Sequence, residues 1–192
     1  SHRQSGSVGP KLISHTKETK HMVRVARFEK VSLRRFVTDW VATFPQQTVE
    51  QAVAAYERIR LPERATSGSA GYDLFAPVGF ELGAGEGIKI PTGLRVLIEE
   101  GWVLTIYPRS GLGFKYRFQL DNSVGVIDSD YARSDNEGHI FMRMTNDNRE
   151  GKSLIVPSGT AFAQGIFLPF GITVDDHAQG VRNGGLGSTT GR

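Results

Sequence analysis

Two carboxylates separated by a single residue stand in the stretch Leu120–Tyr131, LDNSVGVIDSDY. Apolar residues lead into Asp128, Ser129 and Asp130, and this pattern predicts a β-hairpin with the carboxylates at its mouth. Side chains at i and i+2 of an extended chain project from the same face, so the two aspartates could hold a water molecule or a hard cation such as Mg²⁺. Asp-Ser-Asp is also common turn chemistry. On this stretch alone, both interpretations stay open.

Two further stretches have the residue types that bind phosphate. Arg109, Ser110 and Gly111 combine a guanidinium, a hydroxyl and a glycine, which suit phosphate oxygens but also form plain turns. The glycine-rich end that starts at Arg182, RNGGLGSTTG, is either a floppy terminus or a flap whose amides and hydroxyls wrap a polyphosphate. Each stretch alone is weak evidence.

The elements that must position these residues change in kind along the chain. Residues 33–44 have one apolar stripe at helical spacing that ends at Pro45, and a capping-box pattern at Thr48–Gln51 begins a second predicted helix. After about residue 70, short apolar runs alternate with glycine-rich turns, which is typical of a β-sandwich, barrel or jelly roll. The runs expected to be strands are Tyr72–Ala76, Phe80–Leu82, Ile88–Ile90, Leu94–Ile98, Trp102–Tyr107, Phe118–Leu120, Gly125–Asp128, Ile140–Met144, Leu154–Val156 and Phe162–Phe170, with a further short one at 23–31.

Composition limits the classes of protein. With 192 residues and 39% apolar content, the chain should form one substantial core. It has no cysteine, no apolar run long enough to span a membrane and no signal-peptide pattern, so we expect a cytoplasmic protein without disulfides. The net charge of +3 lies entirely in residues 1–21, which resemble a disordered expression tag and linker, so basicity does not indicate nucleic-acid binding.

Five stretches, taken together and in this order, resemble the motifs of the trimeric dUTPases. They are AGYDLFA at residues 70–76, PRSGLGFK at 108–115, GVIDSDY at 125–131, FAQGIFLPF at 162–170 and RNGGLGSTTG at 182–191. The resemblance implies a mainly β jelly-roll domain over residues 61–178, preceded by a strand and two helices at 22–60 and followed by a flexible arm at 179–192. It also implies a homotrimer with shared active sites that hydrolyses dUTP to dUMP and pyrophosphate, with Mg²⁺ on the triphosphate.

The resemblance assigns roles residue by residue. Asp128 is implied as the carboxylate that activates the water attacking the α-phosphorus, Asp73 as part of the water and metal network, and Gln164 as a neighbour of the nucleophile. No protein group is implied as a direct metal ligand, and Asp73 would reach Mg²⁺ only through water. The implied substrate contacts are Arg109, Ser110, Gly111, Asn122, Gly125, Val126, Ile127, Tyr131, Arg182, Leu186, Gly187 and Ser188. Among these, the backbone near Asn122 and Val126 would bind the uracil edge, and Tyr131 would pack on deoxyribose and exclude a 2′-hydroxyl.

The chain departs from the family pattern in places. Leu186 stands where a phenylalanine usually stacks on uracil, Ala161 stands where an arginine usually opens the fourth motif, and residues 132–136 lengthen the segment after Tyr131. Two other interpretations stay open beside dUTP hydrolysis. One is an enzyme related to dCTP deaminase, and the other is a dUTP-gated trimer whose Leu33–Ile59 helices dock a protein partner.

Overall fold

The computed structural model describes residues 22–182 and residue 184. In this part of the chain the strands are β1 (Ala26–Lys30), β2 (Tyr72–Phe75), β3 (Phe80–Leu82), β4 (Gly87–Pro91), β5 (Leu94–Ile98), β6 (Trp102–Pro108), β7 (Phe118–Leu120), β8 (Gly125–Ile127), β9 (Phe141–Asn146), β10 (Leu154–Val156) and β11 (Ala161–Pro169). The helices are α1 (Leu33–Thr43), α2 (Val49–Glu57), α3 (Ser110–Tyr116) and the short 3-10 helix η1 (Tyr131–Arg133).

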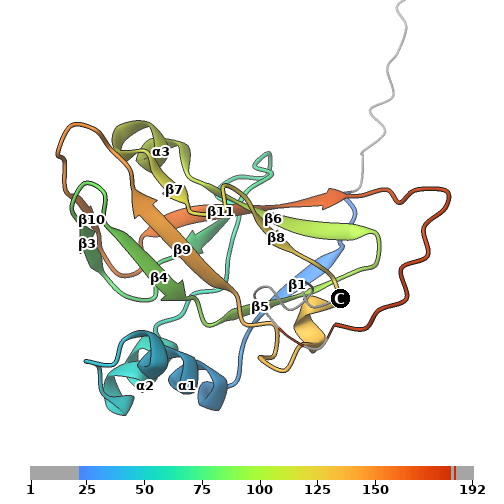
Figure 1. Ribbon diagram of the computed structural model, residues 1–192, viewed down its shortest axis with the longest axis horizontal. Coiled ribbons are helices and arrows are strands. Elements are labelled where there is room, and N and C mark those ends of the chain that lie inside the picture. Colours follow the sequence, from blue (N-terminus) through green and yellow to red (C-terminus); the bar gives the residue numbers. More distant parts are fainter. Residues whose placement is uncertain (1–21, 183, 185–192) are drawn as a thin grey trace, which may run out of the picture.

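Antiparallel sheets build the body of the molecule (Figure 1). Within the described residues their strand orders are β2-β11-β6-β8, β4-β9-β7, β1-β5 and β10-β3. The central strand β6 pairs with β11 along one edge and with β8 along the other. Since β8 leads directly into the Asp128 turn and β6 leads directly into Arg109, this one strand sets the spacing of most predicted site residues.

The N-terminal strand and helices are integrated into this body. Strand β1 pairs with β5, from Ala26 opposite Ile98 to Lys30 opposite Leu94. The Ser32 hydroxyl caps α1, and a reciprocal capping box with Thr48 begins α2, as the sequence pattern indicates. The apolar stripe of α1 faces inward, with Phe36 fully buried. The apolar faces of the two helices therefore pack against this chain's own core.

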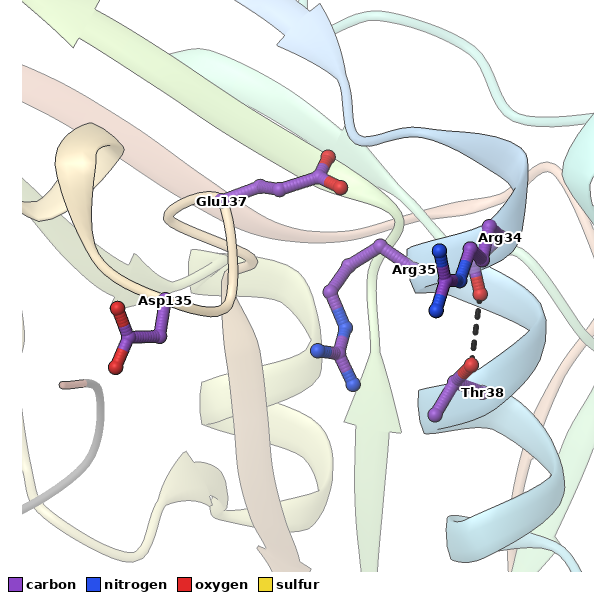
Figure 2. A pocket seen from close by; sticks show the side chains of 5 residues that line it. All are labelled: Arg34, Arg35, Thr38, Asp135 and Glu137. Atoms are coloured by element: carbon purple, nitrogen blue, oxygen red, sulfur yellow. Dashed lines mark hydrogen bonds between the residues drawn. The ribbon is translucent and has the colours of Figure 1, made fainter.

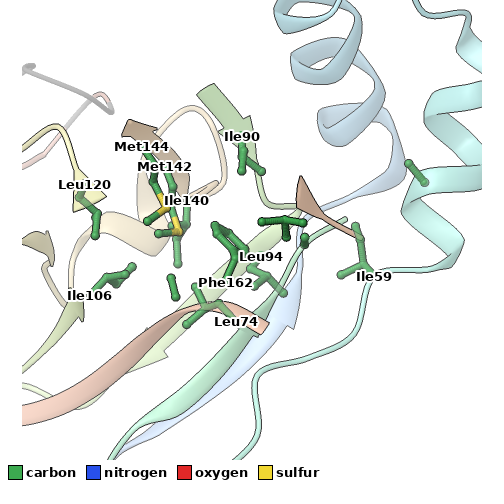
Figure 3. Packing of buried hydrophobic residues seen from close by; sticks show 14 of the residues in the cluster. Ile59, Leu74, Ile90, Leu94, Ile106, Leu120, Ile140, Met142, Met144 and Phe162 are labelled. Atoms are coloured by element: carbon green, nitrogen blue, oxygen red, sulfur yellow. The ribbon is translucent and has the colours of Figure 1, made fainter. Parts of the chain in front are cut away.

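One hydrophobic core runs from the helices into the sheets (Figure 3). Ile59 lies on the helical side of it, Leu94 in the middle, and Phe162 on β11. Gly93, which turns the chain between β4 and β5 at φ +73°, is needed at this junction because a Cβ there would lie 2.2 Å from Ile59 Cδ1. Close packing at this turn joins the extension to the body.

One local expectation is wrong, and one helix was not expected. Leu120–Tyr131 is not a β-hairpin, because β7 pairs with β9 whereas β8 pairs with β6 in another sheet. The turn between them contains Ser123 at φ +66°, which redirects the chain from one sheet to the other. The stretch after Arg109, which also suited a plain turn, forms the helix α3 despite two glycines that disfavour helix, and it ends at Arg117 in a left-handed conformation. None of the helices formed by the described residues is long and apolar enough to cross a membrane.

Candidate active site

Three of the predicted site residues meet where β2, β6 and β11 lie side by side. Arg109 Nε lies 3.2 Å from Asp73 Oδ1, and Gln164 on β11 is directly opposite Asp73 on β2. The Gln164 amide donates a hydrogen bond of 3.0 Å to the carbonyl of Pro108, immediately before Arg109. The sheet register therefore brings a carboxylate, a guanidinium and an amide together from three separate motifs. We call Asp73, Arg109 and Gln164 the phosphate-side group.

Neighbouring residues shape the phosphate-side group. A Cβ on Gly71 would lie 2.5 Å from Gln164 Oε1, so a larger residue there would displace the Gln164 amide. Ala161, which replaces the arginine usual in the resembling family, accepts a hydrogen bond of 3.3 Å from Arg109 Nη1 through its carbonyl. Ser110 and Gly111 follow in the first turn of α3, where both are exposed. The side of this group next to α3 is thus open to solvent.

A second group gathers at the turn after β8. Arg182 Nη2 donates to Asp128 Oδ2 at 2.5 Å, and Arg182 Nε donates to Asp130 Oδ1 at 2.8 Å. The same guanidinium lies over the Tyr131 ring, 5.9 Å from its centroid. We call Asp128, Asp130, Tyr131 and Arg182 the nucleophile-side group. The Asp-Ser-Asp run is a turn in conformation, and yet both carboxylates face one cation, so the two interpretations of this stretch are not exclusive.

Tyr131 presents its ring to Arg182 while its hydroxyl points inward. The hydroxyl donates to the carbonyl of His139 at 2.7 Å and accepts from the Asn136 side-chain amide at 3.0 Å. Burial raises the pKa of Tyr131, which keeps the phenol protonated at neutral pH. The two hydrogen bonds of the hydroxyl therefore fix the position of the Tyr131 ring.

The predicted uracil contacts lie on and before β8. Asn122 is exposed at the turn that precedes the strand. Gly125 is buried against Ile106, and a Cβ added to Gly125 would lie 3.1 Å from the Ile106 Cβ. Val126 is 60% exposed, and Ile127 is half-buried opposite Leu104. Leu186, Gly187 and Ser188 lie outside the described residues.

The two groups lie at opposite ends of β6. Ile127 pairs with Leu104 near the start of that strand, whereas Arg109 follows its last residue, Pro108. Asp128 is therefore level with Val103, six residues from Arg109, which corresponds to about 20 Å along an extended chain. Figure 1 shows the same separation, with α3 and η1 at opposite ends of the body. One copy of the described chain does not bring Asp128 to Asp73, Arg109 and Gln164.

The described residues contain no cluster of three or more histidine, aspartate or glutamate side chains placed to enclose a metal ion. Asp73 is the one carboxylate of the phosphate-side group, and its oxygen already contacts Arg109. A cation held mainly by substrate oxygens and water needs no more than such a single contact.

A buried network beside the nucleophile-side group was missed by sequence reasoning. The structure places His139 fully buried between Asp39 of α1 and the turn at Gly93. Asn136 also contacts the Tyr131 hydroxyl. A single histidine in a glycine-flanked loop has no spacing pattern that could have revealed this arrangement.

Comparison with known proteins identifies the family. The family model described as dUTPase matches residues 57–190. The chain belongs to the dUTPase family. A deoxyuridine 5′-triphosphate nucleotidohydrolase of Lactococcus lactis is 43% identical over 134 residues, which cover 68% of this chain and 88% of that protein. One from Desulfitobacterium hafniense is 39% identical over 140 residues, or 68% of this chain and 87% of the relative.

Solved structures agree with this assignment. The dUTPase of Streptococcus mutans is 39% identical, with a TM-score of 0.54, and the match covers 62% of this chain and 91% of that one. A dUTPase mutant from phage phi11 of S. aureus shares the fold at 19% identity, with a TM-score of 0.57 over 82% of this chain and 98% of the other. The predicted fold class, a mainly β dUTPase jelly roll with an N-terminal helical extension, is confirmed. This dUTPase is an enzyme that hydrolyses dUTP, a dUTP diphosphatase.

Proposed function

We propose that this dUTPase converts dUTP and water to dUMP and pyrophosphate in sites built between the subunits of a homotrimer. The separation of the two groups along β6 carries this proposal. A site that contains both Asp128 and the phosphate-side group requires the two to come from different copies of the chain, because one copy holds them about 20 Å apart. Rotational symmetry supplies such pairings at every interface of a closed ring.

The C-terminal segment gives independent support for association. Phe170, Ile172, Val174 and Val181 follow or lie beyond β11, with side chains 52%, 76%, 109% and 83% exposed. Several exposed apolar side chains on one extended segment indicate a surface that another chain covers. We infer that a neighbouring subunit covers this segment in the trimer.

In the reaction, Asp128 orients the attacking water and removes its proton. The water oxygen forms a bond to the α-phosphorus as the bond from that phosphorus to the bridging oxygen breaks, and pyrophosphate leaves with the electron pair. Arg182 binds Asp128 through Oδ2 alone, and the carboxylate side chain is 49% exposed, so Oδ1 is available for water.

Cationic and amide donors neutralise the triphosphate. Arg109 and Arg182 supply guanidinium groups that match phosphate oxygens, with Ser110 as a hydroxyl donor. A Cβ on Gly111 would meet nothing within 4 Å, so packing within the chain does not require glycine there. Close approach of a phosphate to the backbone explains the glycine instead.

The residues present fit Mg²⁺ bound mainly by the triphosphate. Asp73 would hold the ion through water, in keeping with the preference of Mg²⁺ for oxygen ligands and retained water. When bound, the ion supplies charge neutralisation on the phosphate oxygens. This chain's own part is to place Asp73 beside Arg109 so that neither charge stands unpaired before substrate binds.

Base and sugar are selected on the other side of the site. Backbone groups near Asn122, Val126 and Ile127 would pair with the uracil edge, and cytosine, whose donor and acceptor are reversed, would leave them unpaired. The Tyr131 ring would pack on deoxyribose and leave no room for a 2′-hydroxyl.

The shared site is tested by complementation between inactive subunits. Asp128→Asn and Arg109→Ala are expected to be inactive alone, but co-expressed with different tags and purified as mixed trimers they should recover activity. Random mixing restores up to about a quarter of the wild-type sites, since each intact site needs the Arg109 side from one variant and the Asp128 side from the other. Mixed trimers with no more activity than the separate variants would show that one subunit supplies both groups.

The reaction is tested by a product assay on dUTP, UTP, dTTP and dCTP, each with Mg²⁺ and with EDTA. Metal-dependent release of pyrophosphate from dUTP alone is the expected result. Ammonia release from dCTP would indicate a deaminase. Binding of dUTP without turnover would favour a dUTP-gated trimer that docks a protein partner on the Leu33–Ile59 helices. The burial of Phe36 and Trp40 in this chain's own core is evidence against that alternative.

A further inference from the structure

The loop that carries Tyr131 is closed upon itself. Tyr131 and His139 bound the segment between β8 and β9, and the Tyr131 hydroxyl donates to the His139 carbonyl at 2.7 Å across the loop. Ser134 Oγ donates to the Tyr131 carbonyl at 2.7 Å. Gly138, at φ +73°, lies so near the start of the loop that a Cβ there would be 2.6 Å from Ala132 Cα. The position of the Tyr131 phenol thus depends on the position of the His139 backbone.

Helix α1 in turn holds the His139 ring. Nε2 accepts a hydrogen bond of 2.8 Å from the backbone N–H of Gly93. Nδ1 therefore carries the proton and donates a hydrogen bond of 2.6 Å to Asp39 Oδ2. Arg35, one turn earlier on α1, binds both oxygens of Asp39 at 3.0 and 2.6 Å. The His139 side chain is fully buried and that of Asp39 is 13% exposed. Water is therefore a poor substitute for either partner.

The protonation states of these groups fit a fixed chain of hydrogen bonds from Asp39 through His139 to Tyr131, which we call the relay. Burial holds the pKa of His139 below its ordinary value of 6.5, although the hydrogen bond to Asp39 acts in the opposite direction. At neutral pH the imidazole is neutral, which leaves Nε2 free to accept from Gly93 while Nδ1 donates.

The same loop contacts the helix at a second point. Glu137 accepts hydrogen bonds from the Ser32 backbone N–H at 2.7 Å and from the Ser32 hydroxyl at 2.6 Å, at the N-cap of α1. Figure 2 shows Glu137 extending from the loop toward the start of α1, beside a pocket of about 330 Å³ that Arg35 and Asp135 also line. Helix α1 and the loop meet through charged and polar contacts, so the loop conformation depends on the docked helix.

We propose that Asp39 and His139 are positioning residues for Tyr131. Helix α1 holds the His139 ring, the His139 carbonyl holds the Tyr131 hydroxyl, and the ring is kept where the sugar of the substrate packs. The N-terminal helical extension, which lies outside the five motifs, thereby sharpens the choice of deoxyribose over ribose. The inference rests on the sugar-packing role proposed above for Tyr131.

The test compares kcat/KM for dUTP with kcat/KM for UTP. Asp39→Ala should lower this ratio by about tenfold, because the buried imidazole loses its partner and the carbonyl that pins Tyr131 shifts. Asp39→Asn keeps the shape and an acceptor oxygen, and should restore most of the ratio. The matched control is Gln47→Ala, which removes the 2.7 Å hydrogen bond from Trp40 Nε1 elsewhere in the extension. It should lower the melting temperature but leave the ratio within about twofold.

A double-mutant cycle separates positioning from general loss of stability. Tyr131→Phe removes the hydroxyl and should lower the ratio by itself, and adding Asp39→Ala to it should then have no further effect on the ratio. Equal effects of Asp39→Ala in both backgrounds, or an unchanged ratio in Asp39→Ala, would overturn the relay.

The premise has its own control. Tyr131→Leu removes the aromatic ring and should abolish most of the discrimination. If Tyr131→Leu lowers the ratio while Asp39→Ala does not, the relay alone is wrong. If Tyr131→Leu leaves the ratio unchanged, the sugar-packing role of Tyr131 is wrong, and the proposal that Asp39 and His139 position it is wrong as well. Melting temperatures of all variants ensure that each is assayed while folded.

Discussion

Arg182 Nη2 donates a hydrogen bond of 2.5 Å to Asp128 Oδ2, so the C-terminal segment returns to the turn that bears the proposed catalytic carboxylate. Its Nε binds Asp130 at the same time. A triphosphate carries more negative charge than these two carboxylates, and we expect the guanidinium to transfer to it when dUTP binds.

Replacement of Arg182 tests that transfer. Arg182→Ala should reduce kcat/KM for dUTP about 10- to 100-fold, the usual effect of losing one charged hydrogen bond to phosphate. Arg133→Ala is the matched control, because Arg133 is an exposed arginine on η1 in the same region. Steady-state kinetics on both variants decide the matter, and equal activities would exclude a substrate role for Arg182.

Asp128→Asn should lower kcat by about 10²- to 10⁴-fold, since an amide does not take the proton of the attacking water. Binding of a non-hydrolysable dUTP analogue, measured by calorimetry, should change much less. Asp130→Asn provides the comparison, since Asp130 shares Arg182 but is not proposed to activate water. Turnover of Asp128→Asn within tenfold of the parent would show that another group is the base.

Arg109→Lys should raise KM for dUTP about tenfold, with a smaller change in kcat. Lysine retains the charge but not the planar fork that contacts Asp73 and the Ala161 carbonyl and that we propose to bind phosphate oxygens. Arg117→Lys is the matched control and should be neutral, because Arg117 lies at the other end of α3 and pairs with Asp147 at the surface. A KM for Arg109→Lys equal to that of the control would remove Arg109 from the phosphate site.

The buried His139 predicts a pH dependence of stability. Its pKa in the folded protein lies below the ordinary 6.5, so below that pH the unfolded chain binds the proton more readily than the folded one. The stability is fully present above about pH 6.5 and is lost as the pH falls toward the folded-state pKa. Asp39, Arg35 and Glu137 are the charged groups that act on this ring.

Melting temperatures at about pH 7.5 and about pH 5.5 measure this effect. The drop between them should be smaller in His139→Gln than in the parent protein. Burial raises the pKa of Glu137, but its hydrogen bonds to Ser32 and the nearby arginines lower it overall. The stability that Glu137 contributes is therefore lost only below about pH 4.5, outside the range compared. An identical drop in both proteins would mean that His139 titrates in the fold as it does in the unfolded chain.

Sequence patterns predicted the fold class well because they are local. The apolar spacing of α1 and the capping box at Thr48 are read within a few residues, and both elements form as expected. The motifs also indicated that Asp73, Arg109 and Gln164 act together, and the register of β2, β6 and β11 brings them together.

What escaped prediction depends on contacts between distant segments. Which sheet β8 joins is decided by its pairing with β6, and neither strand records that choice in its own residues. The Asp39–His139 hydrogen bond joins residues 100 positions apart, through side chains with no motif of their own. Predicted boundaries at residues 60/61 and 178/179 remain predictions, as does the disorder of residues 1–21, which lie outside the described residues.

Because the two groups lie at opposite ends of β6, we expect the activity per subunit to depend on enzyme concentration. In the proposed trimer, a subunit that has dissociated from its neighbours keeps every residue of the site but has no complete site. The specific activity of this dUTPase should therefore fall with enzyme concentration once the trimer begins to dissociate, and a folded but inactive subunit incorporated into a trimer would impair its neighbours as well as itself.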